Sequence, residues 1–434
     1  MRPPLGDFSP DWMLAGLYAA AICGFPLAGL LPSLAGLDPG AGTLPYRALV
    51  LMIAVSVMVR WLVVARRVCL GPYVVWMSLV WLLLLARMLY DFNVQPMPLA
   101  VQPGEYVVLA IGVCLLPAIA MLESPTFATL RLAWRLAMTG LAGAAIGLAV
   151  LLWRDGLGGI WVERLSTEVL NPISLGHMGA SLSLLSLAAP APRASLGRSR
   201  RLMRASVRTV LFVLGLVIVI ATASRGPMLS LLVATLAYHV VQPGRTYLQG
   251  MLGRGLPLLA LVVLVASGSA LLIQGLTELR PVARVTGILD ESNAERHRMA
   301  GIALLQFAER PLTGDAMVER QKRDYPHNVL LEAGMALGIG GLIAVAAIVG
   351  SALRAAMRIL TSRRDAAWVA LIAIQYVSAA LVSGSLFLSD SFWAFCTAAV
   401  AVATLRGSTK TLTAANPVGG ARQAETGDSR SALP

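Results

Sequence analysis

A tight break between two apolar runs, Ser224-Arg225-Gly226-Pro227, is the first place where residue types suit phosphate chemistry. Pro227 fits the first turn of a helix, and Gly226 lets the backbone reverse before it. Arg225 therefore lies beside a helix start, where free N–H groups and the helix dipole already favour an anion. The alternative is an arginine that only reaches out to lipid headgroups.

A second pair of arginines lies on an expected loop helix. Ser292-Asn293-Ala294-Glu295 has the form of a capping box, and Pro311 marks the other end. Arg296 points into the apolar face of this helix, whereas Arg298 projects from nearly the opposite side. That face comprises Met299, Ala300, Ala303 and Phe307. An arginine on a packed face is costly unless it meets an anion, either a ligand or a carboxylate such as Glu295 or Asp390.

The third motif is Pro326-His327-Asn328, at the start of another apolar run. Of the four histidines (His177, His239, His297 and His327), only His327 is expected to cap a helix at this surface between cationic neighbours. The helix dipole and these neighbours disfavour the imidazolium, so a neutral ring that accepts a proton is expected at pH 7. The alternative is a histidine that only satisfies a helix end. Asp390 is expected on the same side, either orienting His327 or pairing with an arginine.

Composition identifies the elements that must position these residues. The chain has 434 residues, of which 57% are hydrophobic and only 13% charged. Soluble domains carry roughly a quarter charged residues, so the sequence predicts an all-α integral membrane protein. The net charge of +13 is attributed to membrane topology and not to a nucleic-acid partner. The four cysteines show no paired spacing, which argues against a disulfide framework and a cysteine metal site.

Apolar runs long enough to span a membrane predict about twelve helices. The expected spans are 12–35, 46–65, 71–90, 106–122, 132–153, 173–190, 208–223, 227–242, 256–274, 328–351, 366–388 and 391–406. The run from Trp12 is interpreted as a retained first span and not as a signal peptide. Residues 1–406 thus form one polytopic domain, and the Ser-, Thr-, Ala- and Gly-rich residues 407–434 are expected to be a disordered cytoplasmic tail.

Every second connection is basic, which places those connections and both termini in the cytoplasm. The arginines concerned are Arg66, Arg67, Arg131, Arg135, Arg193, Arg198, Arg200, Arg201, Arg204, Arg208, Arg245, Arg254, Arg354, Arg358, Arg363 and Arg364. Residues 275–327 then form one long loop on the outer face. This loop carries many cationic residues, against the usual trend for that side, which indicates a role beyond topology. After it, Gly334, Gly338 and Gly341 are spaced for close helix packing.

These motifs resemble the O-antigen ligase and polymerase superfamily, which also includes pilin O-glycosyltransferases. The string HNVLLEAGMALGIGG from His327 resembles the family's histidine signature, and the 224–226 triplet resembles its SRG turn. Arg296, followed by Pro311-Leu-Thr-Gly314, resembles its loop arginine and P-x-x-G element. The chain departs from the pattern at Asp315-Ala316, where the family often has x-G, and at Ala300, where an aromatic residue often follows the loop arginine.

The resemblance implies a glycosyltransferase bundle of the GT-C type that uses a polysaccharide on undecaprenyl-pyrophosphate. Arg225 and Arg296 would bind the pyrophosphate, and His327 would deprotonate the acceptor hydroxyl or position it. Arg298, Asn328, Asp390 and Lys322 are further binding candidates, whereas Gly226, Gly334, Gly338 and Gly341 are structural. No metal-ligand spacing occurs on the outer face, so inverting chemistry without a metal or other cofactor is expected.

The acceptor distinguishes the candidate activities. A ligase gives the glycan to the lipid A–core oligosaccharide, a polymerase to another lipid-linked unit, and a pilin transferase to a serine. The modest outer loops favour the ligase, located in the bacterial inner membrane among membrane lipids with a periplasmic site. A transporter or flippase of an anionic lipid is the alternative from another class, but Glu332 is the only acidic residue well inside an expected span.

Overall fold

The computed structural model describes residues 11–64, 68–69, 71–94, 102–155, 165–190, 197–241 and 291–405. The expected span 256–274, the loop before residue 291 and the tail 407–434 lie outside these residues. The chain divides into two compact units, Met1–Thr404 and Leu405–Pro434, and all the helices described here belong to the first.

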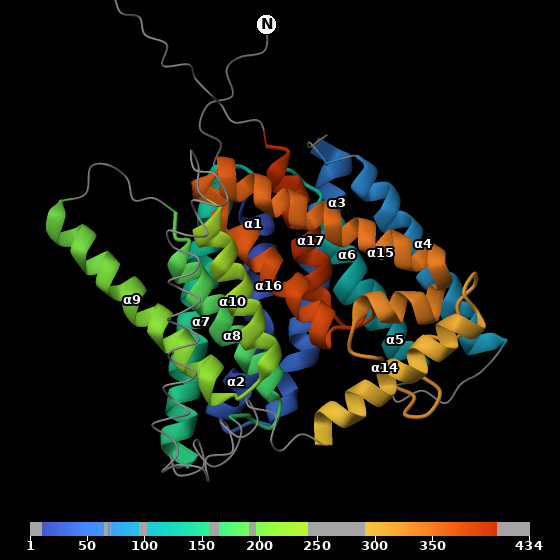
Figure 1. The fold of residues 1–434 in the computed structure, drawn as a ribbon. Helices are drawn as coiled ribbons and strands as arrows, with labels where there is room; N and C mark the ends of the chain where they lie inside the picture. Colours follow the sequence, from blue (N-terminus) through green and yellow to red (C-terminus); the bar gives the residue numbers. More distant parts are fainter. Residues whose placement is uncertain are drawn as a thin grey trace, which may run out of the picture. The chain divides into compact units, whose positions relative to one another are not determined.

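The described secondary structure is helical, in agreement with the expected all-α class (Figure 1). The elements are α1 (Trp12–Ala19), η1 (Ala20–Gly24), α2 (Phe25–Leu34), η2 (Pro39–Gly42), α3 (Thr43–Val64), α4 (Pro72–Asn93), α5 (Pro103–Val107), η3 (Val108–Leu115), α6 (Leu116–Ala120), α7 (Phe127–Asp155), α8 (Pro172–Leu187), α9 (Arg198–Ala221), α10 (Arg225–Val240), α14 (Glu291–Glu309), α15 (Val329–Ser362), η7 (Arg364–Ala366), α16 (Ala367–Ser383) and α17 (Asp390–Ala403).

Within the described ranges, seven helical stretches are long and apolar enough to cross a membrane. They are Trp12–Leu34, Pro39–Val63, Pro72–Asn93, Pro103–Ala120, Phe127–Arg154, Ser199–Ala221 and Val329–Ser362. The helices α16 and α17 are apolar but shorter. Each expected span except 256–274 overlaps a described helix. The chain is therefore an all-α membrane protein with several spans.

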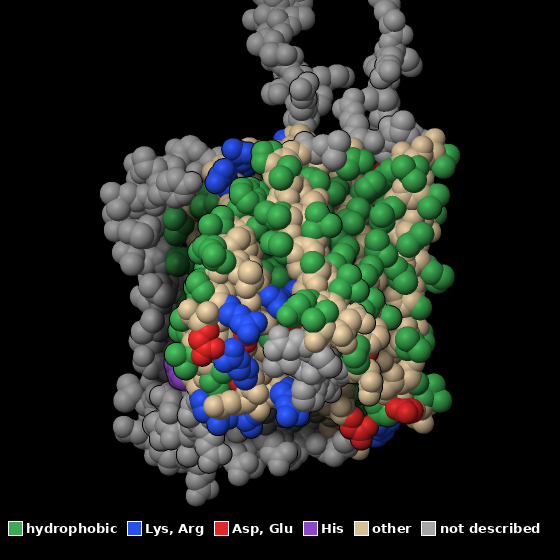
Figure 2. Space-filling view, turned by 90° about the vertical axis from the view of Figure 1, so that its right-hand side faces the viewer, with side chains coloured by type: hydrophobic (Ala, Val, Ile, Leu, Met, Phe, Trp, Pro, Cys, Tyr) green, Lys and Arg blue, Asp and Glu red, His purple; other side chains and the backbone are tan. Residues whose placement is uncertain are grey.

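The surface of these helices carries large apolar side chains, as expected for helices in contact with lipid. Leu62 is 87% exposed and Trp153 is 79% exposed, although both are apolar. Figure 2 shows a largely hydrophobic face whose Asp and Glu side chains lie in its lower half, with Lys and Arg side chains there and at its upper edge. Inside the bundle, Trp81 and Trp393 pack with ring centroids 5.0 Å apart.

Helix α15 overlaps the expected span 328–351 but is broken at Gly338. This glycine has φ +70° and ψ −165°, outside the helical region, and the two segments of α15 run in different directions (Figure 1). The segment before the break is only about 13 Å long at 1.5 Å per residue, too short to cross a bilayer. Gly338 is therefore a backbone hinge point and not the helix-packing glycine that its spacing suggests.

The loop that follows α14 fills the break in α15. The N–H of Ile339 donates to the carbonyl of Pro311 (2.7 Å), and the N–H of Asp315 donates to the carbonyl of Met335 (2.7 Å). A Cβ at Gly338 would lie 2.6 Å from the carbonyl carbon of Leu312, so the loop backbone leaves no room for a side chain at position 338. Gly314 also has φ +70° and faces the Ala336 backbone with the same lack of room.

Arg87 of α4 completes this junction. Its guanidinium donates to the carbonyl oxygens of four residues across the break: Ala336 (2.9 Å), Asp315 (3.0 Å), Thr313 (2.6 Å) and Gly314 (3.1 Å). Asp91, one turn later, pairs with Arg87 (3.3 Å) and accepts the N–H of Met317 (2.9 Å). Arg87 thus satisfies one carbonyl of the broken helix, that of Ala336, and three carbonyls of the loop packed against it.

We predict that Gly338→Ala destabilises the protein by about 2–4 kcal/mol, since it combines a left-handed alanine with a backbone clash. Gly340→Ala is the matched control, because a Cβ there meets no atom within 4 Å. Thermal unfolding in detergent and deuterium uptake by residues 311–317 measure the effect. Equal stability of the two variants would contradict the role assigned to Gly338.

Candidate functional site

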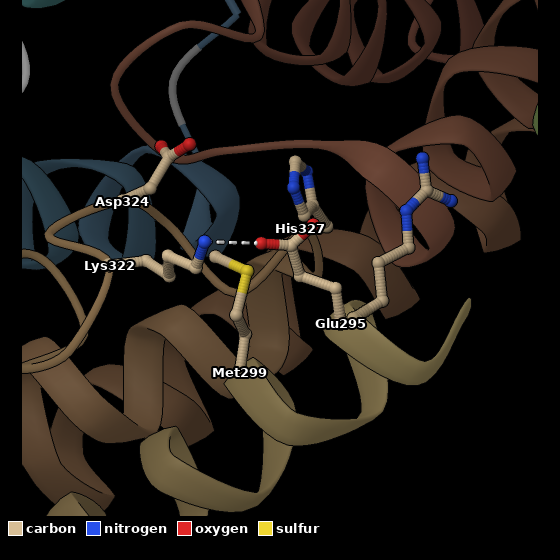
Figure 3. A pocket seen from close by; sticks show the side chains of 6 residues that line it. Glu295, Met299, Lys322, Asp324 and His327 are labelled. Atoms are coloured by element: carbon tan, nitrogen blue, oxygen red, sulfur yellow. Dashed lines mark ion pairs between the residues drawn. The ribbon is translucent and has the colours of Figure 1, made fainter. Parts of the chain in front are cut away.

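A cavity of about 240 Å³ lies between α14 and the loop that leads into α15. Six side chains line it: Glu295, Arg296, Met299, Lys322, Asp324 and His327. Figure 3 shows Glu295 and Met299 coming from α14, with Lys322, Asp324 and His327 contributed by the loop. Three of the sequence-predicted site residues, Arg296, Lys322 and His327, are therefore brought together.

His327 is held in a conformation that side chains rarely adopt. Its φ of +56° lies in the left-handed region, at a cost of about 1–2 kcal/mol. The next residue, Asn328, is the N-cap of α15 and accepts the N–H groups of Leu330 (3.0 Å) and Leu331 (3.1 Å). Its amide also donates to the carbonyl of Leu381 in α16 (2.8 Å). Asn328, a predicted substrate ligand, therefore acts here as the anchor that fixes the histidine.

The surroundings of the His327 ring favour its neutral form. The Tyr325 ring packs edge-on at 4.6 Å, and Nδ1 is buried without a hydrogen-bond partner among the described residues. Burial is the main cause that lowers the pKa of His327, and Arg296 adds to it, whereas Asp324 and Glu295 act in the opposite direction. The neutral ring expected from the sequence is thus supported, with burial and not the helix dipole as the leading cause.

The helical phase expected for α14 is confirmed. Met299 and Ala303 are buried and Arg296 is half-buried, whereas His297 and Arg298 are exposed. The helix is described from Glu291, one residue before the serine of the expected capping box. Arg296 therefore lies on the packed side of α14 and lines the cavity.

Asp315, at the variable position that follows Gly314, ties the loop to α14. Its carboxylate accepts hydrogen bonds from Gln306 of α14 (2.8 Å) and Arg320 (2.9 Å), and it pairs with Arg310 (3.5 Å). Burial tends to raise the pKa of Asp315, but these partners outweigh burial and lower it. The residue after Gly314 is thus an ionised anchor that ties the loop to α14 and so keeps Arg296 beside His327.

The Arg225 turn reaches the same end of α16 as His327. Arg225 is half-buried at the start of α10, and Ala223, two residues before it, has φ +47°. A Cβ on Gly226 would lie 3.4 Å from the hydroxyl of Ser383, two residues after the Leu381 carbonyl that anchors Asn328. Arg225 is not among the six side chains that line the cavity.

The remaining candidates have other contacts. Asp390 accepts the N–H of Ser391 (2.6 Å), whose hydroxyl reaches the carbonyl of Ala21 (3.0 Å). The carboxylates that act on His327 are instead Asp324 and Glu295. Lys322 pairs with Glu295 (2.8 Å). The sequence had suggested Glu295 as a partner of Arg296 instead. Gly334 faces the Phe307 ring of α14, where a Cβ would lie 3.4 Å from it.

Sequence reasoning missed Asp324, Tyr325 and Met299 as neighbours of the histidine, and it missed Arg87 entirely. The signal for Asp324 was its position three residues before His327, in the same turn of chain. Within the ranges that the structure describes, no three His, Cys, Asp or Glu side chains are grouped to hold a metal ion.

The fold and this cavity define a class: a helical, multi-span membrane protein with a mixed-charge pocket beside a broken helix. Residues 210–346 match the family model described as O-Antigen ligase, and this segment contains the Arg225 turn, α14 and His327. The match, over about a third of the chain, confirms the resemblance to the O-antigen ligase and polymerase superfamily, whose members are glycosyltransferase-like enzymes. No curated protein matches the chain.

We predict that His327 titrates below the ordinary histidine pKa of about 6.5. Arg296→Gln should raise this pKa, because it removes a positive charge that disfavours the imidazolium. Arg298→Gln, on the exposed side of the same helix, is the control and should leave it unchanged. NMR of ring-labelled histidine, with the His327 signal assigned from His327→Gln, provides the measurement. A midpoint at or above 6.5 in the unmodified protein would refute the neutral-ring assignment.

Proposed function

We propose that the protein is an O-antigen ligase, which moves a polysaccharide from undecaprenyl-pyrophosphate to the lipid A–core oligosaccharide. The observation that carries this proposal is the position of His327. Its buried Nδ1 lacks a partner within the described chain, and it borders a cavity with two cations, Arg296 and Lys322. The segment that supplies these residues is the one that matches the O-antigen ligase model.

The proposed reaction needs one base and one anion site. His327 takes the proton of an acceptor hydroxyl, and that oxygen attacks the anomeric carbon of the donor sugar from the face opposite the pyrophosphate. The new C–O bond forms as the bond to the pyrophosphate oxygen breaks, and the leaving group keeps the electron pair, so the anomeric configuration inverts. Arg296, with Arg225 at the same end of α16, stabilises the charge that develops on the pyrophosphate.

A periplasmic site in the inner membrane is part of the proposal. The alternation of basic connections favours cytoplasmic termini and an outer position for the loop 275–327. The C-terminal end of α16, which Asn328 binds and beside which the Arg225 turn lies, falls on the outer side in that topology. Cysteine labelling that places residues 225 and 327 on opposite sides of the membrane would contradict the proposal.

A product assay distinguishes the ligase from its alternatives. We expect purified protein in detergent to transfer glycan from the lipid-linked donor to lipid A–core with a chelator present, and His327→Ala to lower the rate about 10²–10⁴-fold. Unchanged thermal unfolding of that variant is the control. Longer lipid-linked chains with untouched lipid A–core would indicate a polymerase, and the absence of any covalent product would favour a transporter.

The two loop-helix arginines provide a matched comparison. Arg296→Ala should abolish transfer, because it removes a planar donor on the cavity side, whereas Arg298→Ala on the exposed side should have a milder effect. Initial rates at saturating acceptor give the ranking. The reverse ranking would mean that the donor binds outside the cavity.

A further inference from the structure

The charges around the cavity pose a problem for an anion site. Two cations line it, Arg296 and Lys322, but so do two carboxylates, Glu295 and Asp324. With His327 neutral, these groups leave no net charge, whereas a pyrophosphate diester carries about two negative charges. The cavity in this arrangement therefore attracts a pyrophosphate weakly. For a pyrophosphate to bind tightly, one of the two carboxylates must release its cation.

The Glu295–Lys322 ion pair is the contact that a ligand can break most easily. Glu295 and Lys322 point toward one another, with Nζ and Oε1 2.8 Å apart (Figure 3). Their side chains are 48% and 49% exposed, so water screens the pair and its net contribution is small. Asp324 is less accessible, and one of its oxygens accepts the N–H of Tyr325 (2.8 Å).

The backbone beneath Lys322 is fixed, although its side chain is free to change partner. The buried Glu319 carboxylate accepts the N–H groups of Gln321 (2.9 Å) and Lys322. The neighbouring Arg323 has φ +63°, and its N–H donates to the carbonyl of Glu319 (3.0 Å). A flexible four-carbon stem on a fixed turn lets the ammonium move from Glu295 to a ligand without refolding the loop.

We propose that Glu295 is a built-in competitor, a carboxylate that holds Lys322 until a pyrophosphate replaces it. This inference rests on the proposed function and adds a specificity-determining residue to it. A phosphodiester with a single charge, such as a phospholipid headgroup, displaces Glu295 poorly, whereas a pyrophosphate with two charges displaces it well. Glu295 thus keeps abundant membrane lipids out of the site. The lowered pKa of Glu295, caused first by its hydrogen bond from Lys322, keeps this competitor ionised.

Binding of inorganic pyrophosphate and of phosphatidylglycerol to the purified protein in uncharged detergent tests this inference. Glu295→Gln should bind pyrophosphate about three- to tenfold tighter and should gain measurable binding of phosphatidylglycerol. Lys322→Ala should bind pyrophosphate about three- to tenfold more weakly. In the Lys322→Ala background, most of the gain from Glu295→Gln should disappear, because the competitor acts through Lys322.

Glu309→Gln is the matched control. Glu309 also lies on α14 and pairs with an exposed cation of the same loop, Arg320 (2.6 Å, 55% and 42% exposed), but it does not line the cavity. Its affinity for pyrophosphate should stay within about twofold of the unmodified protein. Equal tightening by Glu309→Gln, unchanged affinity in Glu295→Gln, or a full gain without Lys322 would each overturn the inference.

Glycan transfer is measured on the same preparations, so that the two proposals fail separately. Transfer to lipid A–core without the expected binding pattern would overturn the role of Glu295 and leave the ligase assignment intact. The expected binding pattern without transfer would support the competitor and refute the ligase assignment.

Discussion

The break in α15 at Gly338 is the constraint on which the rest of the site depends. A helix that is interrupted inside a bundle releases carbonyl and N–H groups that lipid does not satisfy. Here the loop from Pro311 to Asp315 binds the N–H of Ile339 and the carbonyl of Met335, and Arg87 binds the carbonyl of Ala336. The same junction therefore fixes the loop that carries Lys322 and Asp324, and it fixes the short first segment of α15, whose start presents His327.

A chain of polar contacts carries this constraint from the junction to α14. Asp315 donates its N–H to the broken helix, while its carboxylate binds Gln306 of α14 and Arg320 of the loop. Gln306 in turn accepts the N–H of Arg320 (3.1 Å), so helix and loop are tied twice. Arg296 lies on this helix, so the same contacts hold the helix that carries the arginine against the loop that leads to His327.

The sequence predicted the parts that depend on local periodicity. The described helices that overlap the expected spans and the buried side of α14 follow from the periodicity of apolar residues. The break was not predictable in this way, because a G-x-x-x-G spacing fits both close helix packing and a left-handed glycine. Arg87 was missed because its partners are backbone carbonyls more than 200 positions away in the chain. Glu295 likewise approaches His327 only after the loop folds against α14.

Backbone strain identifies the same site without reference to any family. Among the described residues, the non-glycine residues with positive φ are Ala223, Arg323 and His327. The first precedes Arg225 by two residues, the second lies between Lys322 and Asp324, and the third is the candidate base. Each costs about 1–2 kcal/mol and persists only where the surroundings over-determine it. A structural membrane bundle has no need of strained turns beside one end of α16 and at one cavity, so their position supports the proposal that these side chains are placed for chemistry.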